Sequence, residues 1–454
     1  MSFSFRRVIY GNIQEGLKRF HVIFLLGPRK CGKTVALRQV EEDRGDAVYV
    51  DFKGLTREES QDVFSEICES IRMGREKVYL LDEITYAFFP EYEIERIAVA
   101  YTEVERAQTR VVLTGSQSVA LETWGMRSFS AKALYLREDF LSYPEWLSYM
   151  QEVHPEESME PSEDTYQRFL KGTRKFYDFS SLAEYLQGCL EETIISNQKT
   201  SNVLFGNDCY LLDVETLVDI VYQTLFTLHN QVSAKAFESN HMLRDGIEYY
   251  YRDVCRELNL DERIAASFVG RYSSFRSKEA HVLEQGLLFL LRAGLITITP
   301  VSSSLEHIPN YYQDLWAGNG RFRYKDELFR TYNICIRYPM FYVEILKDIL
   351  EDHMPESIPR ALLGSIVECH VRGILSSKNC FTYHDSEGRE IDYVNVLNQE
   401  AIEITVADKR MRQLHFECVP EGYKRTLLTK SSREEVKGIR RVPYYEFIYE
   451  RSRR

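Results

Sequence analysis

The sequence predicts an α/β fold: a parallel sheet in the first third of the chain, then a helical region, then a smaller α/β domain. Between about residues 20 and 140, short apolar runs alternate with helical patterns. From about 167 to 300 the patterns are helical, and after about 355 one helix precedes several strands. Alternating strands and helices are typical of a parallel sheet covered on both faces.

Chain length predicts several domains, because 454 residues exceed what one hydrophobic core usually organises. We expect an α/β domain over 1–150, a helical region over 151–345 and a second α/β domain over 346–454. The acidic, proline-containing stretch at 153–166 predicts a linker or surface loop at the boundary between the first two.

Composition excludes several classes of protein. With 44% hydrophobic and 28% charged residues, the chain resembles ordinary globular proteins. The net charge of -12 disfavours a protein that coats nucleic acid non-specifically. No apolar stretch is long enough to span a bilayer, so we expect a cytoplasmic protein without membrane contact. The cysteines form no CxxC pair, which disfavours a zinc ribbon or a disulfide framework.

Five apolar runs in the first domain predict its strands, at residues 21–26, 47–51, 77–83, 110–116 and 133–136. Between the third and fourth, residues 91–108 predict a helix, because apolar side chains recur there at helical spacing.

Residues 278–301 predict a helix, a turn at Gly294 and a β-branched strand, a pattern typical of the last helix and wing of a winged-helix module. After it, residues 361–377 predict a helix. Residues 380–385, 390–397, 400–408, 423–430 and 444–450 predict strands.

The motif GPRKCGKT, residues 27–34, matches the phosphate-binding pattern G-x-x-x-x-G-K-[ST] between a predicted strand and a predicted helix. Backbone amides of such a P-loop surround phosphate oxygens, its lysine neutralises the terminal phosphates, and its hydroxyl helps to hold Mg²⁺. The predicted ATP site comprises Gly27, Pro28, Arg29, Lys30, Cys31, Gly32, Lys33, Thr34 and Val35. The first domain is therefore predicted to be a P-loop NTPase.

Two further strand ends supply partners for this loop. The third strand ends in Asp82, a candidate Mg²⁺ ligand, and Glu83, which can polarise an attacking water. The fourth ends in Thr114 and Ser116, whose hydroxyls can orient water or contact the γ-phosphate. Glu83 and Lys33 are the predicted catalytic residues. The glutamate beside the metal aspartate and the lack of an NKxD signature favour ATP over GTP.

The sequence leaves two questions open around this site. A cation near the γ-phosphate assists hydrolysis, and Arg127, Lys132 and Arg137 all follow the fourth strand closely enough to supply it. Cys31 lies between lysines that can lower its thiol pKa, or it is simply a small residue that the loop tolerates.

Three acidic residues near the C-terminus suggest a second site: Glu368 on a predicted helix, and Asp392 and Glu403 on neighbouring strands. Carboxylates so placed can bind Mg²⁺ and assist phosphodiester hydrolysis. The pattern looks like a PD-(D/E)XK nuclease core, but Thr405 stands where that core has a lysine, and Lys409 is the nearest substitute. The alternative is a degenerate nuclease fold kept for packing or binding.

The whole order of motifs resembles a prokaryotic family of AAA-type ATPases whose C-terminal domain of unknown function is restriction-endonuclease-like. The motifs are GPRxxGKT, LLDE, a strand ending TGS, LREDFLSYPEWL, GxxxE, GREIDYV and AIEIT. The resemblance implies the P-loop, Asp82 and Glu83 roles given above and marks Leu141 to Trp146 as the family's post-sensor segment.

The leading hypothesis is an Mg²⁺-dependent ATPase whose nucleotide state controls its C-terminal domains. DNA, a protein partner and a homo-oligomer all stay open. Arg271, Arg276 and Lys278 beside the predicted wing favour DNA contact. The alternatives are an ATP-dependent DNA nuclease and a low-turnover, ATP-gated signalling or scaffold switch.

Overall fold

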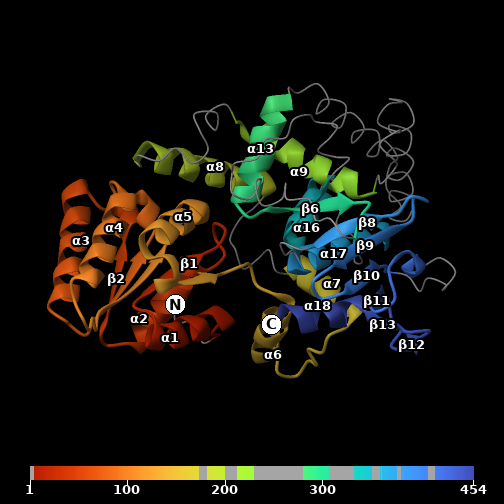
Figure 1. Cartoon of the computed structure of the whole chain (residues 1–454), viewed down its shortest axis with the longest axis horizontal. Helices are drawn as coiled ribbons and strands as arrows, with labels where there is room; N and C mark the ends of the chain where they lie inside the picture. The colour runs from red at the N-terminus through yellow and green to blue at the C-terminus, as the bar shows by residue number, and fades with distance from the viewer. Residues whose placement is uncertain are drawn as a thin grey trace. The chain divides into compact units, whose positions relative to one another are not determined.

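The computed structural model (Figure 1) describes residues 5–172, 181–199, 212–229, 280–305, 332–349, 358, 360–375, 380–406 and 415–453. The chain forms two compact units. The N-terminal unit comprises Met1–Glu145 and Tyr185–Leu211, and the C-terminal unit comprises Trp146–Glu184 and Leu212–Arg454. Arg271, Arg276, Lys278 and Lys409 lie outside the described residues.

The N-terminal unit contains a parallel sheet in the order β2-β3-β4-β1-β5. Its strands are β1 (Val22–Leu26), β2 (Ala47–Asp51), β3 (Val78–Asp82), β4 (Arg110–Thr114) and β5 (Leu134–Arg137). All five lie where the apolar runs predict strands, so the predicted parallel-sheet domain is confirmed. β1 lies between β4 and β5, which places the loop that follows it at the centre of the sheet edge.

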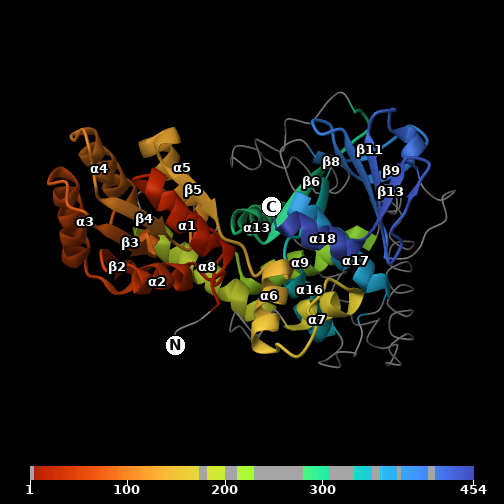
Figure 2. The same cartoon turned by 90° about the horizontal axis from the view of Figure 1, so that it is seen from below.

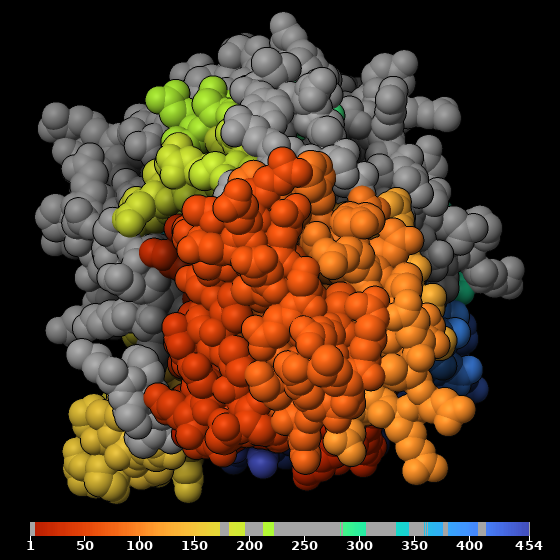
Figure 3. Space-filling view, turned by 90° about the vertical axis from the view of Figure 1, so that its left-hand side faces the viewer, coloured from red at the N-terminus to blue at the C-terminus, as the bar shows by residue number. Residues whose placement is uncertain are grey.

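Helices cover both faces of this sheet (Figure 2). They are α1 (Val8–Arg19), α2 (Lys33–Asp43), α3 (Arg57–Arg72), α4 (Pro90–Thr102) and α5 (Ser118–Phe129). Alternate residues of β1 divide between the faces: Ile23 packs in the core with α1 and α2, and Phe24 in the core with α3, α4 and α5. In the space-filling view the red and orange side chains of this unit form a continuous surface (Figure 3).

The C-terminal unit contains an eight-stranded sheet in the order β12-β13-β11-β10-β9-β8-β6-β7. Its strands are β6 (Ile296–Ser302), β7 (Tyr332–Ile336), β8 (Cys380–His384), β9 (Glu390–Asn395), β10 (Glu400–Ile404), β11 (Lys424–Thr429), β12 (Glu435–Val436) and β13 (Ile439–Pro443). From residue 143 onward, in both units, the described helices are α6 (Tyr143–Val153), α7 (Glu163–Gly172), α8 (Leu182–Lys199), α9 (Val214–His229), α13 (Ala280–Arg292), α16 (Pro339–Ile349), α17 (Arg360–Leu375) and α18 (Tyr444–Ser452). The chain passes from the C-terminal to the N-terminal unit within α8, at Tyr185. No helix among the described residues is long and apolar enough to cross a membrane.

The predicted helix, glycine turn and strand near residue 290 are present as α13, Gly294 with φ of 76°, and β6. β6 pairs antiparallel with β7, as a wing strand would, and also parallel with β8. The strand thus joins the same sheet as the strands predicted for the third domain. The winged-helix assignment and the division into three domains stay predictions.

The strand predicted at residues 444–450 is wrong, because this segment forms helix α18. Its aromatic and β-branched content suggests a strand. The buried positions Tyr444, Tyr445, Phe447 and Ile448 nevertheless follow helical rather than alternating spacing.

Candidate nucleotide-binding site

The P-loop requires glycine at both ends of its turn. Gly27 follows β1 with a φ of 151°, and a Cβ atom there would lie 2.1 Å from the carbonyl oxygen of Glu138. Gly32 has a φ of 107° and directly precedes α2. Any other residue would be strained at these two positions, which explains the glycine spacing of the motif.

Lys33, the first residue of α2, is buried within the loop. Its Nζ donates hydrogen bonds to the carbonyl oxygens of Gly27, at 2.9 Å, and Pro28, at 2.7 Å. The next two residues, Thr34 and Val35, are exposed. The helix start therefore presents the Thr34 hydroxyl to solvent and holds the lysine charge over the loop.

Cys31 is fully buried, and burial raises the pKa of its thiol to about 11, although nearby Lys33 acts in the opposite direction. The thiol is therefore not activated by the lysines. This supports the interpretation of Cys31 as a small, buried residue of the loop. Its neighbour Lys30 adopts a positive φ of 58°.

Arg7, just before α1, supports the loop from the N-terminal side. Its guanidinium donates to the carbonyl oxygens of Cys31, at 2.7 Å, and Asp139, at 3.0 Å. It also forms ion pairs with Glu138 and Glu145. Arg7 lies outside every motif, so sequence reasoning missed it.

The two acidic partners of Arg7 experience different surroundings. Burial raises the pKa of Glu138 to about 8, although Arg7 opposes this shift. For Glu145, burial also acts upward, but Arg7 and the hydrogen bonds from Ser142 outweigh it and lower the pKa. The Leu141–Trp146 segment thus contributes Glu145, which caps α6 and anchors Arg7.

Asp82 and Glu83 lie at the carboxyl end of β3. The Tyr49 hydroxyl donates to Asp82 Oδ2 at 2.6 Å, and the backbone N–H of Glu83 donates to Asp82 Oδ1 at 3.0 Å. Glu83 adopts a left-handed backbone conformation with φ of 51°. Its carboxylate accepts hydrogen bonds from the N–H and the hydroxyl of Ser116, at 2.9 and 2.8 Å. Burial raises the pKa of Glu83, with Lys33 acting against it.

The end of β4 connects Glu83 to the loop. β4 lies between β3 and β1 in the sheet, so Ser116 follows a strand adjacent to both. Ser118, at the start of α5, accepts from the N–H of Gly27 at 2.7 Å and donates to its carbonyl oxygen at 2.6 Å. The buried Thr114 hydroxyl makes no hydrogen bond among the described residues. The structure thus brings together the predicted loop, Asp82, Glu83, Thr114 and Ser116.

The three candidate γ-phosphate cations are engaged by other groups or exposed, although Arg137 lies on β5 in register with Leu26, next to the loop. Arg127 pairs with Glu91 and Arg137 with Glu122, both at 2.7 Å, and these arginines are 62% and 44% exposed. Lys132 is exposed as well. No contact of these residues with the loop is found in the described part of the chain.

Helix α8 contacts the site from a distant part of the sequence. Tyr185 donates its hydroxyl to the carbonyl oxygen of Arg29 at 3.0 Å, and Gln117 donates to the Thr193 hydroxyl at 2.6 Å. Glu192 lies 2.9 Å from Arg29 Nε. Sequence reasoning missed this helix because its pattern shows only that it is a helix.

A buried arginine, Arg372, pairs with one of the three C-terminal acids and experiences the charge of a second, Asp392. Glu368 of α17 accepts from Arg372 at 2.7 Å, and Arg372 also donates to the Thr382 hydroxyl at 2.6 Å. That hydroxyl in turn donates to the carbonyl oxygen of Asp392. Burial acts to lower the pKa of Arg372, but Glu368 and other neighbours outweigh it and raise the pKa. The Arg372 guanidinium therefore already engages the Glu368 carboxylate.

Other members of the predicted nuclease-like site are held by the sheet. The Asp392 side chain accepts from the N–H of Ile404 at 2.7 Å, so it is tied to β10. Glu403 and Thr405 are both buried on or next to the same strand. Asp392 and Glu403 thus lie on the neighbouring strands β9 and β10, and the convergence of all three acids on one site stays a prediction.

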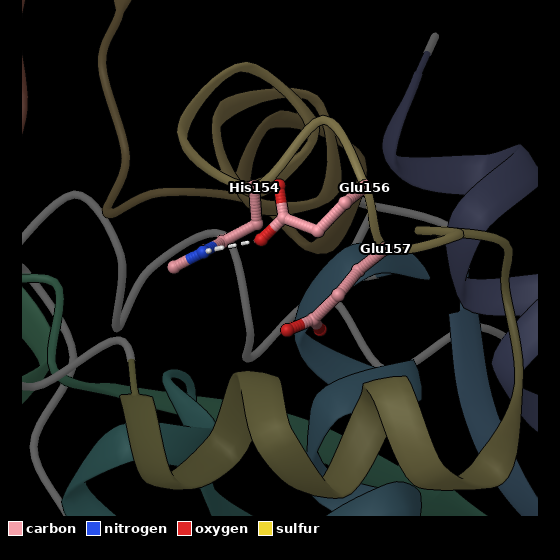
Figure 4. Close-up of side chains that lie close together, drawn as sticks. All are labelled: His154, Glu156 and Glu157. Atoms are coloured by element: carbon pink, nitrogen blue, oxygen red, sulfur yellow. Dashed lines mark ion pairs between the residues drawn. The ribbon is translucent and has the colours of Figure 1, made fainter.

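His154, Glu156 and Glu157 come within ligand distance of one another after α6 (Figure 4). His154 pairs with Glu156 at 3.6 Å, while Glu157 pairs with Arg168 at 2.7 Å. Both glutamates are exposed, so we treat this cluster as surface charge.

Comparison with known proteins identifies the segment that carries the loop. A family model described as an AAA domain matches residues 19–147. This segment is similar to an AAA domain. The match supports an ATP-binding, AAA+-type P-loop domain. The matched residues include Asp82, Glu83 and Ser116. Arg7 and α8 lie outside the AAA-like segment. No curated protein matches the chain.

Three solved structures share limited similarity with the chain. A DNA replication initiation factor has 14% identity, a TM-score of 0.26, and coverage of 63% of this chain and 88% of that one. ORC2 of Aeropyrum pernix, in ADPNP-ADP complexes, has 12% identity and a TM-score of 0.32, with coverage of 66% of this chain and 88% of that one. AMPPCP-bound DnaA from Aquifex aeolicus has 12% identity and a TM-score of 0.25, with coverage of 62% of this chain and 88% of that one. These scores are too low to transfer an activity or a partner.

Proposed function

We propose that the AAA-like segment hydrolyses ATP to ADP and phosphate, and that its nucleotide state controls the rest of the chain. The observation that carries this proposal is the placement of Glu83: its carboxylate is held by Ser116 at the same sheet edge as the Lys33 loop. A phosphate-binding loop without a nearby base would support binding alone.

Phosphate binding follows from the loop geometry. The N–H groups around Gly32 and the start of α2 form a positive environment for phosphate oxygens. Lys33 is buried and held by the carbonyl oxygens of Gly27 and Pro28. A terminal phosphate would attract this ammonium group more strongly than neutral carbonyls do.

Mg²⁺ fits the oxygen donors at this site, because hydroxyl and carboxylate oxygens are its preferred ligands. Thr34 presents an exposed hydroxyl at the start of α2, and Asp82 presents a carboxylate at the end of β3. Bound there, the ion would neutralise charge on the phosphates.

Glu83 would act as the general base. It would accept a proton from water as the water oxygen bonds to the γ-phosphorus and the bond to the ADP oxygen breaks. Burial raises the pKa of Glu83, which makes its carboxylate a stronger base. Ser116 holds that carboxylate in place through two donors.

Control of the C-terminal unit is proposed to run through α8. This helix contacts Arg29 and Gln117 of the site, and the chain passes between the two units within it. A ligand that alters the loop contacts of α8 would therefore act on the segment that connects the units. A DNA or protein partner, a homo-oligomer and a cytoplasmic location fit this proposal.

For the C-terminal part we propose a nuclease-like α/β domain, carrying β6 as a winged-helix-like strand, that does not cut DNA. Arg372 is buried and paired with Glu368, so this acid is already engaged by a cation of the protein. Thr405 supplies no cation where the nuclease pattern has a lysine.

The ATPase proposal is tested by phosphate release from the purified full chain with Mg²⁺ and ATP. We expect release from wild type and its loss in Lys33→Ala, because the loop loses its buried charge. Lys18→Ala is the matched control, since Lys18 is 71% exposed on α1. No release from wild type, or equal rates in the two lysine variants, would contradict the proposal.

A further inference from the structure

Arg29 carries a cation on the phosphate-binding loop itself, two residues after Gly27. Its Nε lies 2.9 Å from Oε1 of Glu192 on α8. The same oxygen lies 3.5 Å from Nζ of Lys53, in the 3-10 turn η1 (Phe52–Gly54). Glu192 is 7% exposed, so two cations share one buried carboxylate.

α8 is fitted closely around this arginine. A Cβ atom on Gly188 would lie 2.5 Å from Arg29 Nη1, so a larger residue there would push the guanidinium aside. One turn earlier, the Tyr185 hydroxyl donates to the carbonyl oxygen of Arg29. The helix therefore contacts both the backbone and the side chain of one loop residue.

The pairing of Arg29 with Glu192 is incomplete. Oε2 of Glu192 is buried and makes no hydrogen bond in the described part of the chain. Arg29 Nε is close to Oε1 but forms no well-aligned hydrogen bond there. Two parallel hydrogen bonds are the strongest arrangement for a guanidinium, and this pair does not form them.

The same carboxylate acts on the proposed base. Burial is the main cause of the raised pKa of Glu83, and the charge of Glu192 adds to it. Tyr86, in the turn after β3, experiences the charges of Glu192, Glu83 and Arg29 together. The charge of Glu192 therefore acts on both Glu83 and Arg29.

We propose that Arg29 binds the γ-phosphate of ATP and that Glu192 competes with this phosphate for the guanidinium. This inference rests on the proposed ATP site. A γ-phosphate offers several charged oxygens in place of one carboxylate oxygen, so it would draw Arg29 away from Glu192. ADP lacks these oxygens and leaves the pair intact.

The exchange distinguishes ATP from ADP at α8. Once Arg29 turns to the phosphate, the ionic partner left to Glu192 among the described residues is the more distant Lys53. A buried carboxylate that loses its closest partner is destabilised, which favours release of α8 from the loop. ATP, and not ADP, therefore loosens α8.

The test is equilibrium binding of ADP and of a non-hydrolysable ATP analogue to the full chain. In Arg29→Ala we expect affinity for the analogue to fall at least about tenfold, the effect of a charge-assisted hydrogen bond, while ADP affinity changes less than about twofold. In Glu192→Gln we expect the analogue to bind several times more tightly and ADP as before. Arg127→Ala is the matched control, because it also removes an Arg–Glu pair. Arg127 lies roughly 14 Å along α5 from Ser118, the residue of that helix that contacts the loop.

The inference is overturned if Arg29→Ala keeps the wild-type ratio of analogue to ADP affinity, or if Glu192→Gln weakens the analogue. Glu192→Gln leaves the loop sequence unchanged, so it decides the matter even if Arg29→Ala fails to fold. If wild type binds both nucleotides and Lys33→Ala binds neither, the proposed ATP site is supported even where the Arg29 variants contradict the inference. Absence of binding by wild type would remove both.

Discussion

Ser116, at the end of β4, donates both its N–H and its hydroxyl to the carboxylate of Glu83, at the end of β3. The Glu83 side chain is therefore fixed by a neighbouring strand rather than by its own loop. Two residues later, Ser118 bonds to both the N–H and the carbonyl oxygen of Gly27. One short segment thus sets the position of the proposed base relative to the P-loop.

Ser116→Ala is expected to reduce kcat about tenfold with little change in KM, because the charge-assisted hydrogen bond positions the base. This hydrogen bond lowers the pKa of Glu83. Its loss raises that pKa, so the acid limb of the kcat–pH profile should move to higher pH. Phosphate release measured across pH tests this, with exposed Ser65→Ala as control. An unshifted profile would argue against Glu83 as the base.

Gly27→Ala is expected to weaken ATP binding at least about tenfold. Its Cβ would lie 2.1 Å from the carbonyl oxygen of Glu138, and the backbone strain costs about 1–3 kcal/mol. Gly54→Ala is the matched control, because nothing lies within 4 Å of a Cβ atom there. Calorimetric titration with ATP measures both, and similar affinities in the two variants would contradict the loop geometry.

Arg7→Ala is expected to lower the free energy of unfolding by about 3 kcal/mol, because it leaves Glu138 and Glu145 buried without their cation. The neighbouring Arg6→Ala should cost less than about 1 kcal/mol, since Arg6 forms an exposed pair with Asp43. Urea unfolding measures both.

The Arg7 effect should depend on pH in a defined direction. The folded pKa of Glu138, about 8, exceeds its ordinary value of 4.5, so its contribution to stability is lost as pH rises across that range. Arg7 lowers this pKa, so its removal raises the pKa further and extends the loss of stability to higher pH. The deficit of Arg7→Ala should therefore grow with rising pH. A deficit that shrinks would contradict the assignment.

Arg372→Gln is expected to lower the free energy of unfolding by about 3–5 kcal/mol, because it leaves Glu368 without its buried cation. Arg440→Ala, with 63% of that side chain exposed, serves as control and should have little effect. Wild type should not cleave DNA with Mg²⁺. Mg²⁺-dependent cleavage that disappears in Asp392→Ala would restore the nuclease hypothesis.

The local sequence predicted the five strands of the N-terminal sheet and the position of the P-loop. The five apolar runs became β1 to β5, and the P-loop motif carries its own requirement for Gly27 and Gly32. The parallel sheet then brings Asp82 and Ser116 to the same edge, as strand ends alone predict.

Long-range contacts could not be predicted from these patterns. Glu192 reaches Arg29 from more than 160 residues away, and Arg7 reaches Glu145 from 138 residues away. A charged residue on a helix shows no sign of its partner in the local sequence. The three arginine and lysine candidates after β4 were chosen by chain proximity, and ion pairs with Glu91 and Glu122 engage Arg127 and Arg137.

The most direct test of the account is turnover by Glu83→Gln, compared with wild type and with the exposed control Glu58→Gln. Loss of a general base should lower phosphate release at least about a hundredfold, while ATP binding stays within about twofold of wild type. The account predicts this separation of turnover from binding. Phosphate release by Glu83→Gln at the wild-type rate would contradict it.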